Sequence, residues 1–284
     1  MRGIKLKFIT ALKIGSLKDL LEKVKTDKNL CLEIRKNYIN IYYKGGNLLQ
    51  VTEKLNIYQF HFDYKYCNNK DNNISLDFIK SLDKKDPIVW INNLPLLMSE
   101  MDSWFLIHPK AEREVQHNLK IANSGIDSDV IIIDIEYAGW TTDKKLFRLD
   151  MLGIQKLEYG YKLILFENKY GGGSIGGSAG IKKHYDDIVS ILNNEPSKEE
   201  LISSVINIIN NKADLGFFEI RLKRSDLQSI EILFLFTEYN LKSMAIKNAL
   251  AHIEKTIPAK LLFMGKDETV IPYSKAKDLW EYEN

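Results

Sequence analysis

The chain of 284 residues is long enough for one large domain or two small ones. Its composition, 45% hydrophobic and 27% charged, is typical of a soluble globular protein. The net charge of +2 is too small to indicate a nucleic-acid-binding protein, although a local basic rim would suffice for one. Because Cys31 and Cys67 are the only cysteines, a disulfide framework and a zinc site built on thiolates are excluded.

The apolar segments are short. None approaches the ~20 apolar residues that a membrane-spanning helix needs. The basic start, Met1–Gly15, lacks the uninterrupted apolar stretch and the cleavage site of a signal peptide. We therefore expect a cytoplasmic protein that does not associate with a membrane.

The first hundred residues are predicted to be rich in β-structure. A short helix is expected over Ser16–Val24, with Ser16 as its cap. Four strand-like runs then predict an antiparallel meander with a hairpin turn at Gly45-Gly46; they are Leu30–Arg35, Tyr38–Lys44, Asn47–Glu53 and Ile57–Tyr66. The aromatic residues of the fourth run share one strand face. They serve either as core under a helix or as a platform for unpaired bases.

Prolines punctuate the apolar stretch from Ile88 to Ile107, so we place a domain junction at 95–105. This gives an N-terminal domain, 1–100, and a second domain, 101–284. The second domain is predicted to contain, in order, helix Pro109–Asn123, strands Val130–Tyr137, Leu146–Ile154 and Tyr161–Tyr170, helices Ala179–Leu192 and Glu199–Asn211, strand Ile230–Tyr239, helix Leu241–Lys255, strand Lys260–Met264 and helix Ser274–Glu283.

Charged residues interrupt the apolar strands between 130 and 170. Glu167 and Lys169 are two apart, so they point to one face of their strand and Asn168 points to the other. Asp150 lies in the preceding strand, and a tight connection at Glu158–Gly160 would set it beside Glu167. Burying such charges is costly unless a cation or a function balances them. The carboxylates suit Mg²⁺, and the lysine suits a water or a phosphate oxygen.

Asp150 followed by Glu167-Asn168-Lys169 resembles the signature of the PD-(D/E)xK nuclease superfamily, and the resemblance covers residues 109 to 192. It implies an α/β (α+β) fold with a restriction-endonuclease-like αβββαβ core, preceded here by the smaller β-meander domain. It also implies hydrolysis of phosphodiester bonds. Asp150, Glu167 and the backbone carbonyl of Asn168 would hold Mg²⁺ or Mn²⁺, and Lys169 would orient or deprotonate the attacking water.

A further acidic residue is expected at the site, and two regions offer one. The pattern Glu-Arg-x-Val-x3-Leu that begins at Glu112 is similar to the first helix of archaeal Holliday-junction resolvases. That likeness assigns Glu112 to the metal site, with Glu114 as the alternative and a solvated glutamate as the rival for either. Glu136 shares a strand face with Asp134. It is a ligand candidate if that face carries Asp150, and otherwise faces solvent at a strand end.

Lys182, Lys183 and His184 follow the glycine-rich segment 170–178. In the superfamily that this chain resembles, the helix after Glu-x-Lys often lends a polar residue to the active site or to the nucleic-acid backbone, and these three residues are the candidates for that role. A solvated basic turn is the alternative for them, and also for the cluster of Arg221, Lys223 and Arg224. The segment 170–178 lacks the Gly-Lys-Ser/Thr end of a nucleotide-binding loop. We expect it to be a flexible loop beside the cleavage site.

The expected substrate is nucleic acid, and double-stranded DNA is favoured over RNA because most relatives act on DNA. A role in restriction, repair or defence against foreign DNA follows only from the habits of the family. The relatives also suggest a homodimer, and the N-terminal domain would supply target choice or a surface for a protein partner. Two other classes stay open: a non-catalytic nucleic-acid- or protein-binding module that kept the nuclease fold, and an unrelated α/β enzyme whose acidic side chains do not converge.

Overall fold

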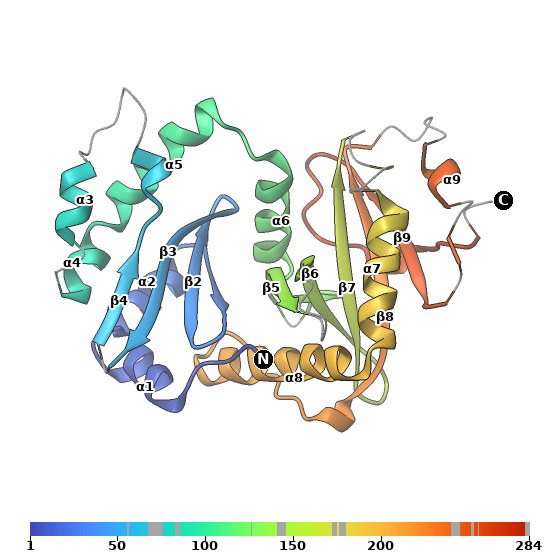
Figure 1. Cartoon of the computed structure of the whole chain (residues 1–284), viewed down its shortest axis with the longest axis horizontal. Helices are drawn as coiled ribbons and strands as arrows, with labels where there is room; N and C mark the ends of the chain where they lie inside the picture. The colour runs from blue at the N-terminus through green and yellow to red at the C-terminus, as the bar shows by residue number, and fades with distance from the viewer. Residues whose placement is uncertain are drawn as a thin grey trace. The chain divides into compact units, whose positions relative to one another are not determined.

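The computed structural model describes residues 1–55, 57–67, 76–82, 86–125, 127–140, 146–171, 175, 180–239, 245–250, 253–254 and 256–281. The chain divides into two compact units, each described by itself below (Figure 1). The N-terminal unit comprises residues 2–117 and 207–221, and the C-terminal unit comprises residue 1, 118–206 and 222–284. Residues 101–117 therefore group with the N-terminal part of the chain. Most of the glycine-rich segment, 172–174 and 176–178, lies outside the described residues.

The N-terminal unit is built on a four-stranded antiparallel sheet with its strands in chain order. The strands are β1 (Leu30–Ile34), β2 (Tyr38–Tyr43), β3 (Gly46–Lys54) and β4 (Ile57–His61). The predicted meander and its hairpin turn are thus confirmed. Gly45 has a φ of +74°, and a Cβ there would lie 2.3 Å from the carbonyl oxygen of Arg113. Only glycine fits this turn without a shift of the backbone.

The fourth predicted strand is shorter than expected. Its aromatic run leaves the sheet after His61 and ends in a 3-10 turn, η1 (Tyr64–Cys67). Phe60, Phe62 and Tyr66 are nonetheless buried in the hydrophobic core of this unit. The prediction that these rings form core is confirmed, and they are not exposed for stacking on bases.

Five helices complete this part of the chain: α1 (Leu6–Ile14), α2 (Lys18–Thr26), α3 (Leu76–Leu82), α4 (Pro87–Asn92) and α5 (Leu94–Ile107). α2 confirms the short predicted helix, but Leu17 rather than Ser16 occupies its N-cap. α1 was not expected, since Lys5, Lys7 and Lys13 interrupt its apolar residues. Pro87 and Pro95 lie in the first turns of α4 and α5, where proline is tolerated because no helical N–H is lost.

The C-terminal unit is built on a six-stranded mixed sheet with the order β10-β9-β8-β7-β6-β5. Its strands are β5 (Ile131–Trp140), β6 (Leu146–Lys156), β7 (Tyr161–Tyr170), β8 (Leu227–Thr237), β9 (Ala259–Met264) and β10 (Lys277–Asp278). β5, β6 and β7 pair antiparallel, which confirms the predicted meander. The tight turn before β7 is also confirmed, with Gly160 at a φ of +88°.

β8 lies parallel to β7, so the chain must cross over between them. α7 (Ile181–Asn193) and α8 (Glu195–Asp214) form this crossover. The spacing of Ile181, Tyr185, Ile188 and Leu192 predicts a buried apolar stripe along α7, and the structure confirms it, because all four side chains are buried. A short 3-10 turn, η3 (Arg224–Asp226), precedes β8, and α9 (Ala245–Leu250) lies between β8 and β9.

The predicted C-terminal helix over Ser274–Glu283 is wrong. This segment contains a 3-10 turn, η4 (Tyr273–Lys275), followed by the short strand β10. The Tyr273 hydroxyl donates to the buried Glu231 carboxylate, and the N–H of Leu279 donates to the carbonyl of Ala259. These tertiary hydrogen bonds hold the segment extended along β9 and override its helical periodicity.

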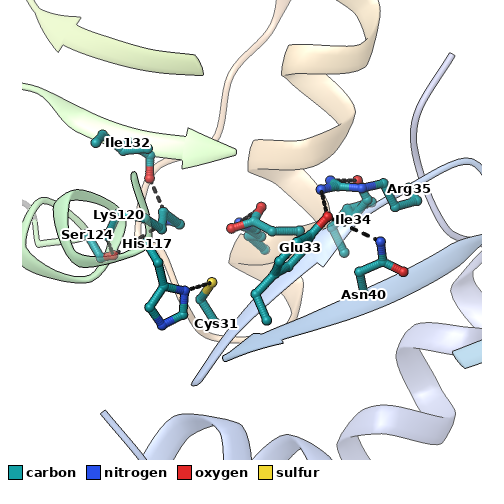
Figure 2. A network of polar contacts seen from close by, with 11 residues as sticks. Cys31, Glu33, Ile34, Arg35, Asn40, His117, Lys120, Ser124 and Ile132 are labelled. Carbon is teal, nitrogen blue, oxygen red and sulfur yellow. Dashed lines mark hydrogen bonds and ion pairs between the residues drawn. The ribbon is translucent and has the colours of Figure 1, made fainter. Parts of the chain in front are cut away.

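α6 (Ala111–Ala122) contributes residues to both units. The sequence spacing predicts an apolar stripe along this helix, made of Ala111, Val115, Leu119 and Ala122, but only Leu119 of these residues is buried. The polar side chains of Gln116, His117 and Lys120 are buried as well. In the N-terminal unit, Nδ1 of His117 lies 3.6 Å from Sγ of Cys31 (Figure 2). In the C-terminal unit, Nζ of Lys120 donates to the carbonyl of Ile132 at the start of β5. Specific partners thus allow α6 to bury these polar groups.

The described residues form a mixed α+β fold with nine α-helices, a four-stranded antiparallel sheet and a six-stranded mixed sheet. Within the same residues, no helix is both long enough and apolar enough to span a membrane.

Candidate active site

The β6–β7 ladder ends where the charged residues begin. Its last pair is Met151–Phe166, and the same register sets Asp150 opposite Glu167. Beyond that pair, the N–H of Asn168 donates to Oδ2 of Asp150 over 2.8 Å. A strand residue that forms such a bond directs its N–H and C=O to the same neighbouring strand. The carbonyl of Asn168 is therefore also directed toward β6, the strand that carries Asp150.

Glu136 extends this arrangement to a third strand. Tyr137 of β5 pairs with Leu149 of β6, and the residue before Tyr137 therefore lies opposite Asp150. Directly opposed residues of antiparallel strands share a face. By extension of the register, Glu136, Asp150 and Glu167 occupy facing positions of β5, β6 and β7, and we call these three positions the acidic row.

Glu136 is inside a strand, not at the end of one. β5 continues to Trp140, so Glu136 does not lie at a strand end, and its side chain is half-buried. The backbone of Glu136 has a φ of +50°, in the left-handed region that non-glycine residues rarely adopt. Such a conformation costs about 1–3 kcal/mol and clusters at functional sites. A register shift between Ile132 and Asp134 lies just before it.

Lys169 and Glu167 form a buried ion pair. Nζ of Lys169 lies 2.8 Å from Oε1 of Glu167, and the two side chains are only 5% and 4% exposed. The predicted sharing of one strand face is confirmed by this contact. A buried pair of this kind contributes little net stability, but removing one partner leaves an uncompensated charge in the interior.

His184 lies against the same carboxylate. Its Nε2 is 3.1 Å from Oε1 of Glu167, and the ring is 27% exposed. A carboxylate oxygen only accepts hydrogen bonds from a nitrogen, so Nε2 carries the hydrogen. The other two basic residues of this turn, Lys182 and Lys183, pair with Asp186 and Asp187 one turn further along α7. The structure thus brings His184 to the acidic row, whereas the lysines are directed along their own helix.

Glu112 and Glu114 are both exposed on the part of α6 that belongs to the N-terminal unit. Glu114 lines a pocket of about 410 Å³ in that unit together with Lys44 and Lys110. Asp150 and Glu167 belong to the C-terminal unit. The assignment of Glu112 or Glu114 to the metal site therefore stays a prediction.

The sequence reasoning missed Arg148. This exposed residue of β6 pairs with Ala138 of β5 and is two residues from Asp150, so both side chains share a strand face. The signal was present in the spacing Arg-x-Asp. An exposed guanidinium beside the acidic row is suited to a phosphate oxygen, which it can bind through two N–H groups.

The donors at this site fit a hard cation. Among the described residues, no three His, Cys, Asp or Glu side chains are placed to hold a metal ion together. If a cation binds here, Asp150 and Glu167 would supply carboxylates, and the carbonyl of Asn168 would supply a third oxygen. Mg²⁺ binds oxygen, commonly takes only one or two carboxylates from a protein, and retains several waters. Zinc would prefer nitrogen or sulfur ligands.

The chain matches no protein-family model, no curated protein and no solved structure in the three comparisons made with it. The resemblance to PD-(D/E)xK nucleases therefore depends on the residues of the candidate active site and their arrangement on β6 and β7.

Proposed function

We propose that this protein is a metal-dependent nuclease that hydrolyses phosphodiester bonds, with double-stranded DNA as its substrate. One observation carries the proposal: Asp150 lies opposite Glu167, and Glu167 forms a buried ion pair with Lys169. Carboxylates and an ammonium group on neighbouring strands are the groups that a metal-assisted phosphodiester hydrolysis needs.

Asp150, Glu167 and the carbonyl oxygen of Asn168 would hold Mg²⁺ or Mn²⁺. When bound, this cation would polarise a phosphoryl oxygen and make a water molecule more acidic. The hydrogen bond from the N–H of Asn168 fixes the Asp150 carboxylate of β6 before any ligand binds. Such preorganisation avoids reorganisation of the site during the reaction.

Lys169 has two functions in this proposal. Its ammonium group balances the buried charge of Glu167 in the protein without ligand. During hydrolysis, the same group would donate a hydrogen bond to the attacking water or to the phosphate, where negative charge accumulates. Arg148, at the exposed edge of the row, would contact a neighbouring phosphate.

A non-catalytic module that kept the fold is the alternative. Such a module would have no need for buried ionic groups at these positions, and apolar residues of similar volume would be at least as stable. The presence of Asp150, Glu167 and Lys169 together favours the enzyme. Three further parts of the proposal derive from the family resemblance alone. They are a homodimer, a protein partner for the N-terminal unit, and a role in restriction, repair or defence.

The direct test incubates the purified full-length protein with linear, circular and branched DNA and with RNA, in Mg²⁺ and in Mn²⁺. We expect metal-dependent cleavage by the wild type and none by Asp150→Asn or Lys169→Ala. Lys198→Ala, which removes a surface lysine that pairs with Glu195, is the matched control and should cleave normally. Thermal unfolding of each variant shows whether it is folded. Cleavage by folded Lys169→Ala at the wild-type rate, or no cleavage by the wild type in either metal, would contradict the proposal.

A further inference from the structure

The Glu167 carboxylate receives two donors on one oxygen. Oε1 lies 2.8 Å from Nζ of Lys169 and 3.1 Å from Nε2 of His184. Lys169 belongs to the same strand as Glu167, whereas His184 comes from α7, 17 residues after Glu167 in the chain. Two donors from two elements restrict the rotation of the carboxylate more than either would alone.

The position of His184 is itself fixed by its neighbour in the chain. The Tyr185 side chain is buried, and its hydroxyl accepts hydrogen bonds from the N–H groups of Thr256 and Ile257 at 3.0 and 2.8 Å. The same hydroxyl donates to the carbonyl of Ile257 over 3.0 Å. Tyr185 thus anchors the first turns of α7 to the segment before β9, and His184 is presented to β7 from this anchored turn.

From this geometry we propose that His184 is a positioning residue: it holds the Glu167 carboxylate in the orientation in which it binds the cation. The inference rests on the proposed function, because it concerns the same site. It differs from a contact between His184 and the nucleic-acid backbone, since it requires the histidine to act through Glu167 in the absence of substrate.

His184 acts through the hydrogen-bond donor on Nε2 and not through the charge of its ring. Residues that hydrogen-bond a metal ligand orient it, and their loss typically lowers metal affinity about 10–100-fold. Glutamine places its side-chain N–H close to where histidine carries its Nε2–H, so His184→Gln preserves the donor. His184→Ala removes it. His61→Ala is the matched control, because it removes an exposed histidine from β4 in the N-terminal unit.

The experiment measures Mn²⁺ binding to the full-length protein without nucleic acid, by electron paramagnetic resonance or calorimetry. We expect the dissociation constant of His184→Ala to rise about 10-fold or more. His184→Gln should recover most of that loss, and His61→Ala should bind as the wild type does. Cleavage assays over a range of Mn²⁺ should show the same order, with the rate of His184→Ala approaching the wild-type rate at saturating metal.

The outcomes separate the inference from the proposed function. Equal Mn²⁺ affinity for the wild type and a folded His184→Ala refutes the positioning role and leaves the nuclease proposal intact. Weak Mn²⁺ binding by both His184→Ala and His184→Gln also refutes the positioning role, because the loss of affinity would then not come from the loss of the hydrogen-bond donor. A wild type that binds no Mn²⁺ and cleaves nothing refutes the proposed function, and the inference falls with it.

Discussion

The N–H of Asn168 donates to Oδ2 of Asp150 over 2.8 Å, at the position where the main-chain pairing of β6 and β7 ends. The carboxylate therefore takes the place of a backbone carbonyl of the neighbouring strand. Asp150 has a structural function in this bond in addition to its proposed function as a metal ligand. The two functions can be separated by substitution.

Asp150→Asn keeps an oxygen that can accept from Asn168 but removes the negative charge. We predict that it folds with nearly wild-type stability and has no metal-dependent cleavage. Asp150→Ala removes both and should lose about 1–2 kcal/mol of unfolding free energy as well, since the N–H of Asn168 loses its acceptor. Urea unfolding and a cleavage assay on both variants provide the check. Equal destabilisation by the two substitutions would argue against the structural function.

The buried pair of Lys169 and Glu167 gives a second prediction. Lys169→Met leaves the Glu167 carboxylate buried without its ammonium partner, and we predict a loss of about 3–5 kcal/mol of unfolding free energy. The double variant Lys169→Met/Glu167→Leu should recover much of this loss, because neither charge of the pair is then left buried. Chemical unfolding of the single and double variants measures the recovery. A double variant no more stable than Lys169→Met would contradict the account.

The Asn168 side chain gives a prediction that separates the role of its side-chain amide from the role of its main chain. In the part of the chain that the structure describes, both Nδ2 and Oδ1 of this buried side chain lack a hydrogen-bond partner. An unsatisfied buried polar group costs about 1–3 kcal/mol. Asn168→Val should therefore stabilise the protein and keep its activity, because only the main chain of this residue serves the site. Loss of cleavage in a folded Asn168→Val would assign a function to the amide.

Cys67 gives a prediction for pH. Burial raises the pKa of the Cys67 thiol to about 11, from a usual value of 9.0, with smaller contributions from Glu100 and Asp63. The folded protein thus holds this proton more tightly than the unfolded chain does. The resulting stability is complete below pH 9 and is lost as the pH rises toward 11. We predict that a Cys31→Ser variant, which leaves only Cys67, loses stability over this range faster than the variant lacking both thiols.

The same shift predicts slow thiol chemistry. At pH 8, about one Cys67 side chain in a thousand is a thiolate, and the thiolate is the reactive form. Native Cys31→Ser should react with a disulfide reagent at least about tenfold more slowly than the urea-unfolded protein, in which the thiolate fraction is larger. Equal rates in the two states would show that Cys67 is not buried as described.

Every strand of the two sheets except β10 could be predicted from the sequence, because the signals of these strands are local. Short apolar runs marked β5, β6 and β7, and the tight connection at Glu158–Gly160 predicted that β6 and β7 lie side by side. The same reasoning placed Glu167 and Lys169 on one face, and their contact confirms it. This part of the site follows from the geometry of an antiparallel pair.

Other features depend on contacts that no local pattern reports. The left-handed backbone of Glu136 follows a register shift in β5, and strand alternation alone cannot anticipate it. The extended C-terminal segment results from the bond between Tyr273 and Glu231. The sequence offered Lys182, Lys183 and His184 equally as contacts for the site or the nucleic-acid backbone, and it could not single out His184, because the direction of that side chain depends on how Tyr185 anchors α7. The buried His117 and Lys120 of α6 likewise need partners that lie far away in the sequence or beyond the helix.

The central claim is that Asp150, Glu167 and the carbonyl of Asn168 form one cation site. Anomalous X-ray diffraction from crystals of the full-length protein soaked in Mn²⁺ tests this claim most directly. We expect an anomalous peak within about 2.3 Å of an oxygen of each carboxylate, a distance typical of hard cations bound to oxygen. We also expect that crystals of Asp150→Asn show no such peak. A fully soaked wild-type crystal without a peak between these residues, or with its Mn²⁺ bound elsewhere, would contradict the account.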